Sequence, residues 1–148
     1  MRRIVYVDLD DTLCDFMSAF EKAIKDNPSI QYPQSQYRFF ANLKPIDGGL
    51  DVMQTLKASD RYEPYILSAP STRNPLSYLE KREWVETHLG YEYCKRLILC
   101  PHKGLLKGDY LIDDNVNGKG QDHFEGKLIH FGSSMYPDWH AVRNELGV

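Results

Sequence analysis

The sequence lacks several features that would point to particular classes of protein. No apolar run approaches the roughly 20 residues that a helix needs to cross a bilayer. The net charge of −3 leaves no basic surplus for binding the phosphate backbone of nucleic acids. The three cysteines, Cys14, Cys94 and Cys100, form neither a CxxC pair nor a zinc-like cluster. We therefore expect no membrane, no nucleic-acid polymer as partner, and free thiols in a reducing compartment.

The N-terminus also lacks the pattern of a secretion signal. Arg2 and Arg3 precede an apolar stretch that is too short for such a signal and runs directly into the acids from Asp8 onward. The expected location is therefore the cytoplasm. The length of 148 residues suits one compact domain with a core of its own.

Five short apolar runs are continuous rather than alternating, which is typical of strands buried on both faces of a parallel sheet. They cover residues 4–7, 65–67, 97–100, 110–112 and 128–131. Between them, apolar residues recur at helical spacing within residues 16–24, 50–56, 76–89 and 139–146. Strands that alternate with helices favour an α/β fold with a doubly wound sheet.

One segment, residues 27–47, breaks this alternation. It holds aromatic side chains among polar residues and three prolines. Structureless connections longer than about 15 residues are uncommon and often functional. We therefore expect a single domain, residues 1–148, with a small cap inserted after the first strand at about residues 15–47.

Polar side chains follow four of the apolar runs, close to where each run ends. In chain order they are Asp8-Leu9-Asp10-Asp11-Thr12, then Ser68, then Lys103, then Asp113-Asp114. The carboxyl ends of the strands in an open parallel sheet lie along one edge, and ligands bind there. The sequence therefore predicts that these groups converge on one crevice.

The residue types at this edge favour phosphoryl transfer. Crowded carboxylates repel one another, and Mg²⁺ relieves that repulsion because it prefers oxygen ligands. A lysine and a hydroxyl then suit the oxygens of a phosphoryl group. Asp8 could attack phosphorus as a nucleophile, and Asp10 could give a proton to the leaving oxygen and later take one from water. Each motif alone is a weak signal, but four in this order predict such a site.

These four motifs resemble those of the haloacid dehalogenase (HAD) superfamily phosphatases. Within that superfamily the chain is similar to the 5′(3′)-deoxyribonucleotidases, in residues 8–16, 39–49, 78–85 and 103–114. The resemblance implies a HAD-like Rossmannoid three-layer sandwich, with a central parallel five-stranded sheet and a small helical cap after the first strand. It also implies a Mg²⁺-dependent phosphomonoesterase that forms an aspartyl-phosphate and acts on deoxyribonucleoside monophosphates.

The resemblance further implies roles for individual residues. Asp8 would be the nucleophile and a metal ligand, and Asp10 the general acid and base, with its backbone carbonyl on the metal. Asp113 is the first choice for the remaining metal-binding acid, while Asp114 would hold a metal-bound water or the loop. The phosphate-binding residues would be Thr12, which also positions the loop, Ser68 and Lys103. The nucleobase would contact aromatic residues of the cap, with Phe16, Tyr37, Phe39 and Phe40 as candidates.

The chain departs from the family pattern in three ways. Asp11 stands where many members have Gly, Ala69 after Ser68 offers no second hydroxyl, and the cap looks shorter than in the animal nucleotidases. A HAD phosphatase for another small phosphorylated metabolite is therefore the first alternative, and a non-catalytic binding protein with this fold is the second. Dimers are common among such enzymes, but no apolar stripe demands a homodimer here, so the oligomeric state stays open.

Overall fold

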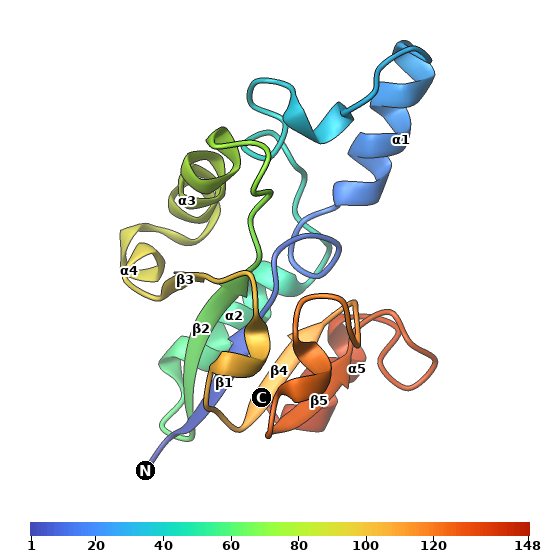
Figure 1. Cartoon of the computed structure of the whole chain (residues 1–148). Helices are drawn as coiled ribbons and strands as arrows, with labels where there is room; N and C mark the ends of the chain where they lie inside the picture. The colour runs from blue at the N-terminus through green and yellow to red at the C-terminus, as the bar shows by residue number, and fades with distance from the viewer.

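A five-stranded parallel sheet forms the centre of the computed structural model, which describes residues 1–148 (Figure 1). The strands lie in the order β3-β2-β1-β4-β5, and each neighbouring pair is parallel. Their bounds are β1 Arg3–Val7, β2 Tyr62–Ser68, β3 Leu97–Leu99, β4 Tyr110–Asp113 and β5 Lys127–His130. The five apolar runs are thus confirmed as the strands.

Strand β2 begins three residues earlier than its apolar run and includes Pro64. A central strand has a neighbouring strand on each side, and a proline has no N–H to donate to either of them. Pro64 is tolerated because β2 pairs with β3 only from Ile66 onward, while Pro64 itself lies opposite Val5 of β1. The apolar pattern did not predict that β2 starts at Tyr62, because Glu63 and Pro64 interrupt it.

Helices cover one face of the sheet. Alternate strand residues, such as Val7, Ile66 and Ile112, belong to a core cluster of 24 buried residues on that face. The short helix α4 (Tyr91–Cys94) contributes Tyr93 to this cluster. The three longer helices with buried residues in it are α2 (Gly49–Ala58), α3 (Leu76–Leu89) and α5 (Trp139–Leu146). The helical periodicity in these three segments is therefore confirmed.

The other face of the sheet is covered by shorter elements. Tyr6, Leu67 and Leu111 point there and form a small cluster with Phe124. The connections above this cluster contain the 3-10 helices η2 (Lys103–Leu105) and η3 (Gln121–His123) instead of a long helix. With two covered faces around a parallel sheet, the predicted α/β fold class is confirmed.

Residues 15–47 leave the carboxyl end of the sheet and stand away from it, at the top of Figure 1. This segment contains α1 (Phe16–Asp26) and the 3-10 helix η1 (Pro33–Ser35). The Asp15 carboxylate caps α1 by accepting the Ser18 backbone N–H at 3.1 Å. The Phe16, Phe39 and Phe40 rings pack together with centroids 5.3 to 6.0 Å apart. This aromatic cluster joins the segment to the core.

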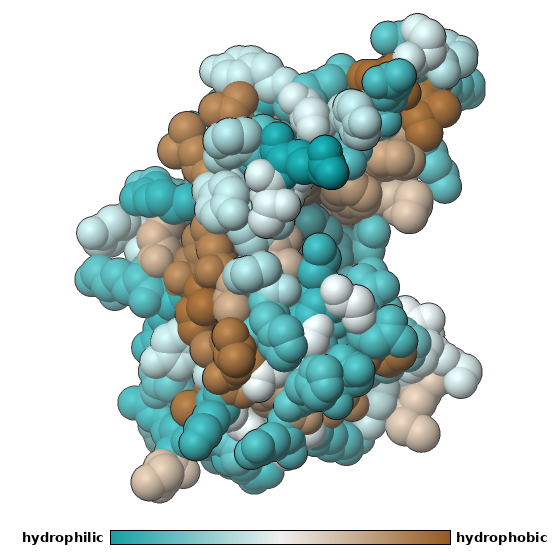
Figure 2. Space-filling model, in the orientation of Figure 1, coloured by the Kyte–Doolittle hydropathy of each residue, from teal (hydrophilic) through white to brown (hydrophobic).

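The surface in Figure 2 is mostly hydrophilic, with a notch between the segment of residues 15–47 and the body that holds the sheet. None of the helices is both long and apolar enough to cross a membrane.

Candidate active site

The loop after β1 turns sharply around one carbonyl. The Leu9 oxygen accepts the backbone N–H groups of Thr12, Leu13 and Cys14 at 2.8 to 3.1 Å. This turn places Asp11 at a φ of +58°, in the left-handed region that favours glycine. Asp tolerates that region better than most side chains, which explains how it can stand where the family pattern often has Gly.

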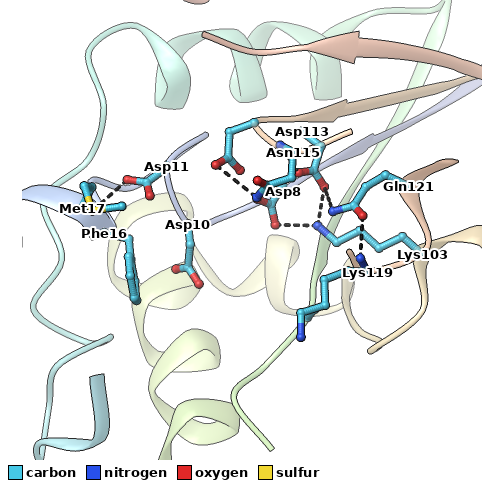
Figure 3. Close-up of a pocket in the computed structure, with 12 residues that line it drawn as sticks. Asp8, Asp10, Asp11, Phe16, Met17, Lys103, Asp113, Asn115, Lys119 and Gln121 are labelled. Atoms are coloured by element: carbon cyan, nitrogen blue, oxygen red, sulfur yellow. Dashed lines mark hydrogen bonds and ion pairs between the residues drawn. The ribbon is translucent and has the colours of Figure 1, made fainter. Parts of the chain in front are cut away.

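Lys103 joins two acids that come from neighbouring strands. Its Nζ lies 2.7 Å from Asp8 Oδ1 and 2.5 Å from Asp113 Oδ2, and all three side chains are almost fully buried (Figure 3). Burial alone would lower the pKa of the Lys103 ammonium, but Asp8 and Asp113 outweigh that effect and raise the pKa. Lys103 is therefore held as a cation inside the site.

Thr12 connects the β1 loop to the acid pair after β4. Its hydroxyl lies 3.5 Å from Asp8 Oδ2 and 3.4 Å from Asp114 Oδ1, and it accepts the Asp114 backbone N–H at 3.2 Å. Thr12 is fully buried and does not line the cavity described below. Its contacts fix the position of Asp114 beside Asp8.

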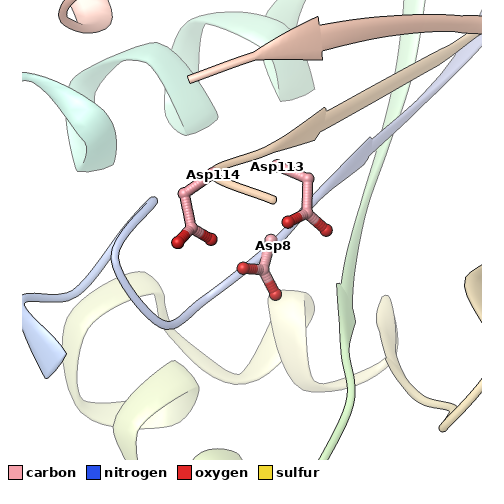
Figure 4. A group of neighbouring side chains, drawn as sticks. All are labelled: Asp8, Asp113 and Asp114. Carbon is pink, nitrogen blue, oxygen red and sulfur yellow. The ribbon is translucent and has the colours of Figure 1, made fainter. Parts of the chain in front are cut away.

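The carboxylates of Asp8, Asp113 and Asp114 form a compact group, with one oxygen of each within 4.8 Å of the others (Figure 4). Burial and then the charge of Asp8 raise the pKa of Asp114 to about 8. Burial also raises the pKa of Asp8, although Lys103 partly offsets this. Both shifts disfavour the ionised carboxylates in the metal-free site, and a hard divalent cation, which carboxylate oxygens suit, would favour them.

A cavity of about 280 Å³ opens beside these acids. Its floor contains Asp8, Lys103 and the acid pair, and Asp10 and Asp11 line it as well. Four further lining residues were not predicted as site residues from the sequence: Met17 of α1, and Asn115, Lys119 and Gln121 after β4. Gln121 donates to Asp113 at 3.4 Å and accepts the Lys119 backbone N–H at 2.8 Å. No sequence motif marked the three residues after β4, because their role depends on how the loop after β4 folds back.

Ser68 stands at the end of β2 with its side chain buried and its hydroxyl without a hydrogen-bond partner. Buried hydroxyls are normally hydrogen-bonded. The adjacent Ala69 lines the cavity. The unpaired Ser68 hydroxyl is thus a free polar group next to the cavity wall.

Asp10 does not join the three-acid group, since its carboxylate lies beside Lys81 of α3 instead. Lys81 Nζ is 2.8 Å from Asp10 Oδ2, and the lysine side chain is only 1% exposed. Lys81 was not predicted from the sequence. Its spacing from Ser77 and Trp84, which are also buried, places it on the inner face of α3 and could have indicated its position.

The four candidate aromatic residues separate in the structure. Phe16 lines the cavity. Phe39 and Phe40 are buried in the core cluster and do not reach the cavity lining. Tyr37 is 76% exposed and belongs to a different depression, beside α1. The structure therefore brings Phe16 alone of the four to the cavity.

Comparison with known proteins connects this arrangement to a family. The family model described as 5′ nucleotidase, deoxy (Pyrimidine), cytosolic type C protein matches residues 25–144. A protein of Vibrio phage KVP40 is 41% identical over 148 aligned residues, which cover 94% of this chain and 81% of the phage protein. The human protein named 5′(3′)-deoxyribonucleotidase, cytosolic type, is 29% identical, with 80% of this chain and 73% of the human protein covered.

Solved structures agree with the fold. The magnesium-bound HAD-hydrolase YfnB from Bacillus subtilis superimposes with a TM-score of 0.69 at 12% identity, with 100% of both chains covered. The HAD fold predicted from the four motifs is thereby confirmed. With the family match over most of its length, the chain belongs to the family of 5′ nucleotidases, deoxy (pyrimidine), cytosolic type C, and is a phosphoric monoester hydrolase of the nucleotidase type.

Proposed function

We propose that this chain is a Mg²⁺-dependent phosphomonoesterase that dephosphorylates deoxyribonucleoside monophosphates through an aspartyl-phosphate. The observation that carries the proposal is the position of Asp8, a buried carboxylate at the end of the central strand, between Lys103 and two further acids. The substrate class follows the names of the human and Bacillus subtilis relatives, both 5′(3′)-deoxyribonucleotidases. The cytoplasmic location remains a prediction of the sequence.

The donor set fits Mg²⁺, which takes carboxylate and carbonyl oxygens. Asp8 and Asp114 would supply carboxylates, and Asp10 its backbone carbonyl. We favour Asp114 over Asp113, because Asp113 already accepts from Lys103, Gln121 and the Asn115 backbone N–H. When bound, the cation supplies positive charge that neutralises the acids and the phosphate oxygens.

The chain's own residues would then carry out two displacements. In the first, an Asp8 oxygen forms a bond to phosphorus while the bond from phosphorus to the ester oxygen breaks. The protonated Asp10 carboxyl gives its proton to the leaving oxygen, which departs as the nucleoside hydroxyl. In the second, a water oxygen forms a bond to phosphorus while the bond from phosphorus to the Asp8 oxygen breaks. Asp10 takes a proton from the water, inorganic phosphate leaves, and Asp8 returns to a free carboxylate.

Two residues would hold the phosphate during these steps. The Lys103 ammonium lies against Asp8 and would neutralise both the nucleophile and the phosphate. The Ser68 hydroxyl, buried and unpaired, would donate to a phosphate oxygen. A phosphate at this point would satisfy the Ser68 hydroxyl, which the protein itself leaves without a partner.

The segment of residues 15–47 would act as the cap over the cavity and contact the nucleoside. Phe16 is the residue of this segment best placed for a nucleobase, since it lines the cavity and its ring is braced by Phe39 and Phe40. Tyr37 would need to move to reach the same place, because it lies outside the cavity.

A nucleotide panel tests the proposal. Release of inorganic phosphate is measured for deoxyribonucleotides, ribonucleotides and sugar phosphates with Mg²⁺ and with EDTA, using Asp8→Asn as the catalytic control. We expect turnover of deoxyribonucleotides that needs Mg²⁺ and is absent in Asp8→Asn. Activity that survived in Asp8→Asn or in EDTA would refute the mechanism, and hydrolysis of sugar phosphates alone would refute the substrate class.

A further inference from the structure

Lys81 is a buried cation outside the motifs of the site. It lies on α3 with its side chain 1% exposed, and its ammonium donates to Asp10 Oδ2 at 2.8 Å. Lysine is almost never fully buried unless it is paired, because removing its charge from water is costly. Helix packing alone therefore does not explain why Lys81 is buried beside an acid that lines the cavity.

The two oxygens of the Asp10 carboxylate have different surroundings. Oδ2 faces the Lys81 ammonium at 2.8 Å, while Oδ1 faces the Cys14 thiol at 3.6 Å. A thiol is a weak donor, whereas an ammonium forms a strong, charge-assisted hydrogen bond with a carboxylate. Lys81 thus fixes one oxygen firmly and leaves Oδ1 as the oxygen available for exchanging a proton.

Lys81 also contacts the segment of residues 15–47. Its ammonium lies 4.7 Å from the centroid of the Phe40 ring, within the range of a cation–π interaction. Phe40 packs in turn against Phe16, which lines the cavity. One buried side chain therefore connects Asp10 to the aromatic cluster that includes Phe16 of the cavity lining.

We propose that Lys81 is a positioning residue that orients Asp10 for proton transfer to and from the substrate. The inference rests on the proposed function, in which Asp10 is the general acid and base. Lys81 keeps its own protons throughout, and the transferred proton moves only between Asp10 Oδ1 and the leaving oxygen or water. Efficient transfer requires the acid within hydrogen-bond reach of its partner, so loss of the anchor at Oδ2 disturbs the geometry of the transfer.

A double-mutant cycle with Asp10 tests this role. Lys81→Met keeps the length of the side chain and removes its charge. We expect it to lower kcat for a deoxyribonucleotide about 10- to 100-fold, part of the 10²- to 10⁴-fold that acid–base catalysis contributes. In an Asp10→Asn background the same substitution should lower kcat no further, because the group through which it acts is gone.

The leaving group provides a readout that a purely structural role would not move. p-Nitrophenolate leaves without a proton, so p-nitrophenyl phosphate needs the general acid less than a nucleotide does. The kcat of Lys81→Met should therefore fall much more with the nucleotide than with p-nitrophenyl phosphate, while KM should stay similar for both. Equal losses with both substrates, or additive losses in the double mutant, would overturn the proposal.

Two further variants keep the test decisive. Arg82→Met removes the neighbouring exposed charge on α3 and should retain wild-type kcat. Lys81→Arg keeps the charge in a broader, planar group, so we expect an intermediate kcat with the same dependence on the leaving group, even if Lys81→Met does not fold. Wild-type kcat in a folded Lys81→Met protein, with Asp8→Asn inactive, would refute the role of Lys81 and leave the proposed function standing.

Discussion

Trp139, the first residue of α5, donates its indole N–H to the backbone carbonyl of Thr12 at 2.8 Å. The two residues are 127 positions apart in the chain, and both are buried. Because the Thr12 hydroxyl contacts Asp8 and Asp114, this bond supports the loop after β1, which carries the proposed nucleophile. Helix α5 therefore helps to hold the loop after β1 in place.

Trp139→Phe should destabilise the protein and lower kcat. The substitution leaves the Thr12 carbonyl buried without a donor, which costs about 1–3 kcal/mol, before any loss from packing. Urea unfolding measures this loss. Trp84→Phe is a matched control, since Trp84 is equally buried and donates at 2.8 Å to the Leu43 carbonyl, which does not belong to the β1 loop. Equal effects of the two substitutions on kcat would contradict a specific role for Trp139.

Asp11 balances backbone strain against a capping interaction. Its φ of +58° is unfavourable for a side chain, but its carboxylate accepts the Met17 backbone N–H of α1 at 2.9 Å. Asp11→Gly removes both effects, each of the order of 1 kcal/mol, so we expect little change in the free energy of unfolding. Asp11→Ala keeps the strain and loses the cap, so it should cost about 1–2 kcal/mol in urea unfolding. Equal stability of the Gly and Ala variants would refute this account.

The strands and the catalytic motifs could be predicted from the sequence because both are local patterns. Strand β1 is a continuous apolar run, and Asp8 follows it directly, so the parallel sheet alone brings Asp8 to the same edge as Ser68 and Asp113. Membership of the α/β class followed from the same alternation.

The residues that hold these motifs could not be predicted in the same way. Lys81 and Trp139 reach the site through the packing of α3 and α5, and nothing beside them in the chain signals a partner. The aromatic candidates show the opposite case. Their residue type suggested contact with a ligand, but Phe39 and Phe40 fill the core next to α1. Contacts between distant elements decide such cases.

Lys119 should contribute to substrate binding. Lys119 is exposed and lines the cavity. It and Lys103 are the two cationic side chains in that lining. An exposed ion pair with a phosphate is worth about 1 kcal/mol, so Lys119→Ala should raise KM roughly fivefold with little change in kcat. The effect should shrink at high salt, because exposed charges are screened. Steady-state kinetics at two ionic strengths measures both. Lys95→Ala, directly after α4 and outside the cavity, is the control, and a similar KM effect there would count against Lys119.

Stabilisation by Mg²⁺ should increase as the pH rises. Burial and the neighbouring Asp8 charge raise the pKa of Asp114 from its ordinary value of 3.8 to about 8. In the metal-free protein, folding therefore binds a proton between those pH values, and stability falls as the pH rises through this window. Mg²⁺ must displace that proton, so the rise in the protein's Tm on adding Mg²⁺ should be larger at about pH 8.5 than at about pH 5.5.

Thermal unfolding with Mg²⁺ and with EDTA measures this rise in Tm at each pH. Asp114→Asn should remove most of the pH dependence of this gain, and a gain that stayed constant with pH in the wild type would show that Asp114 does not hold the cation.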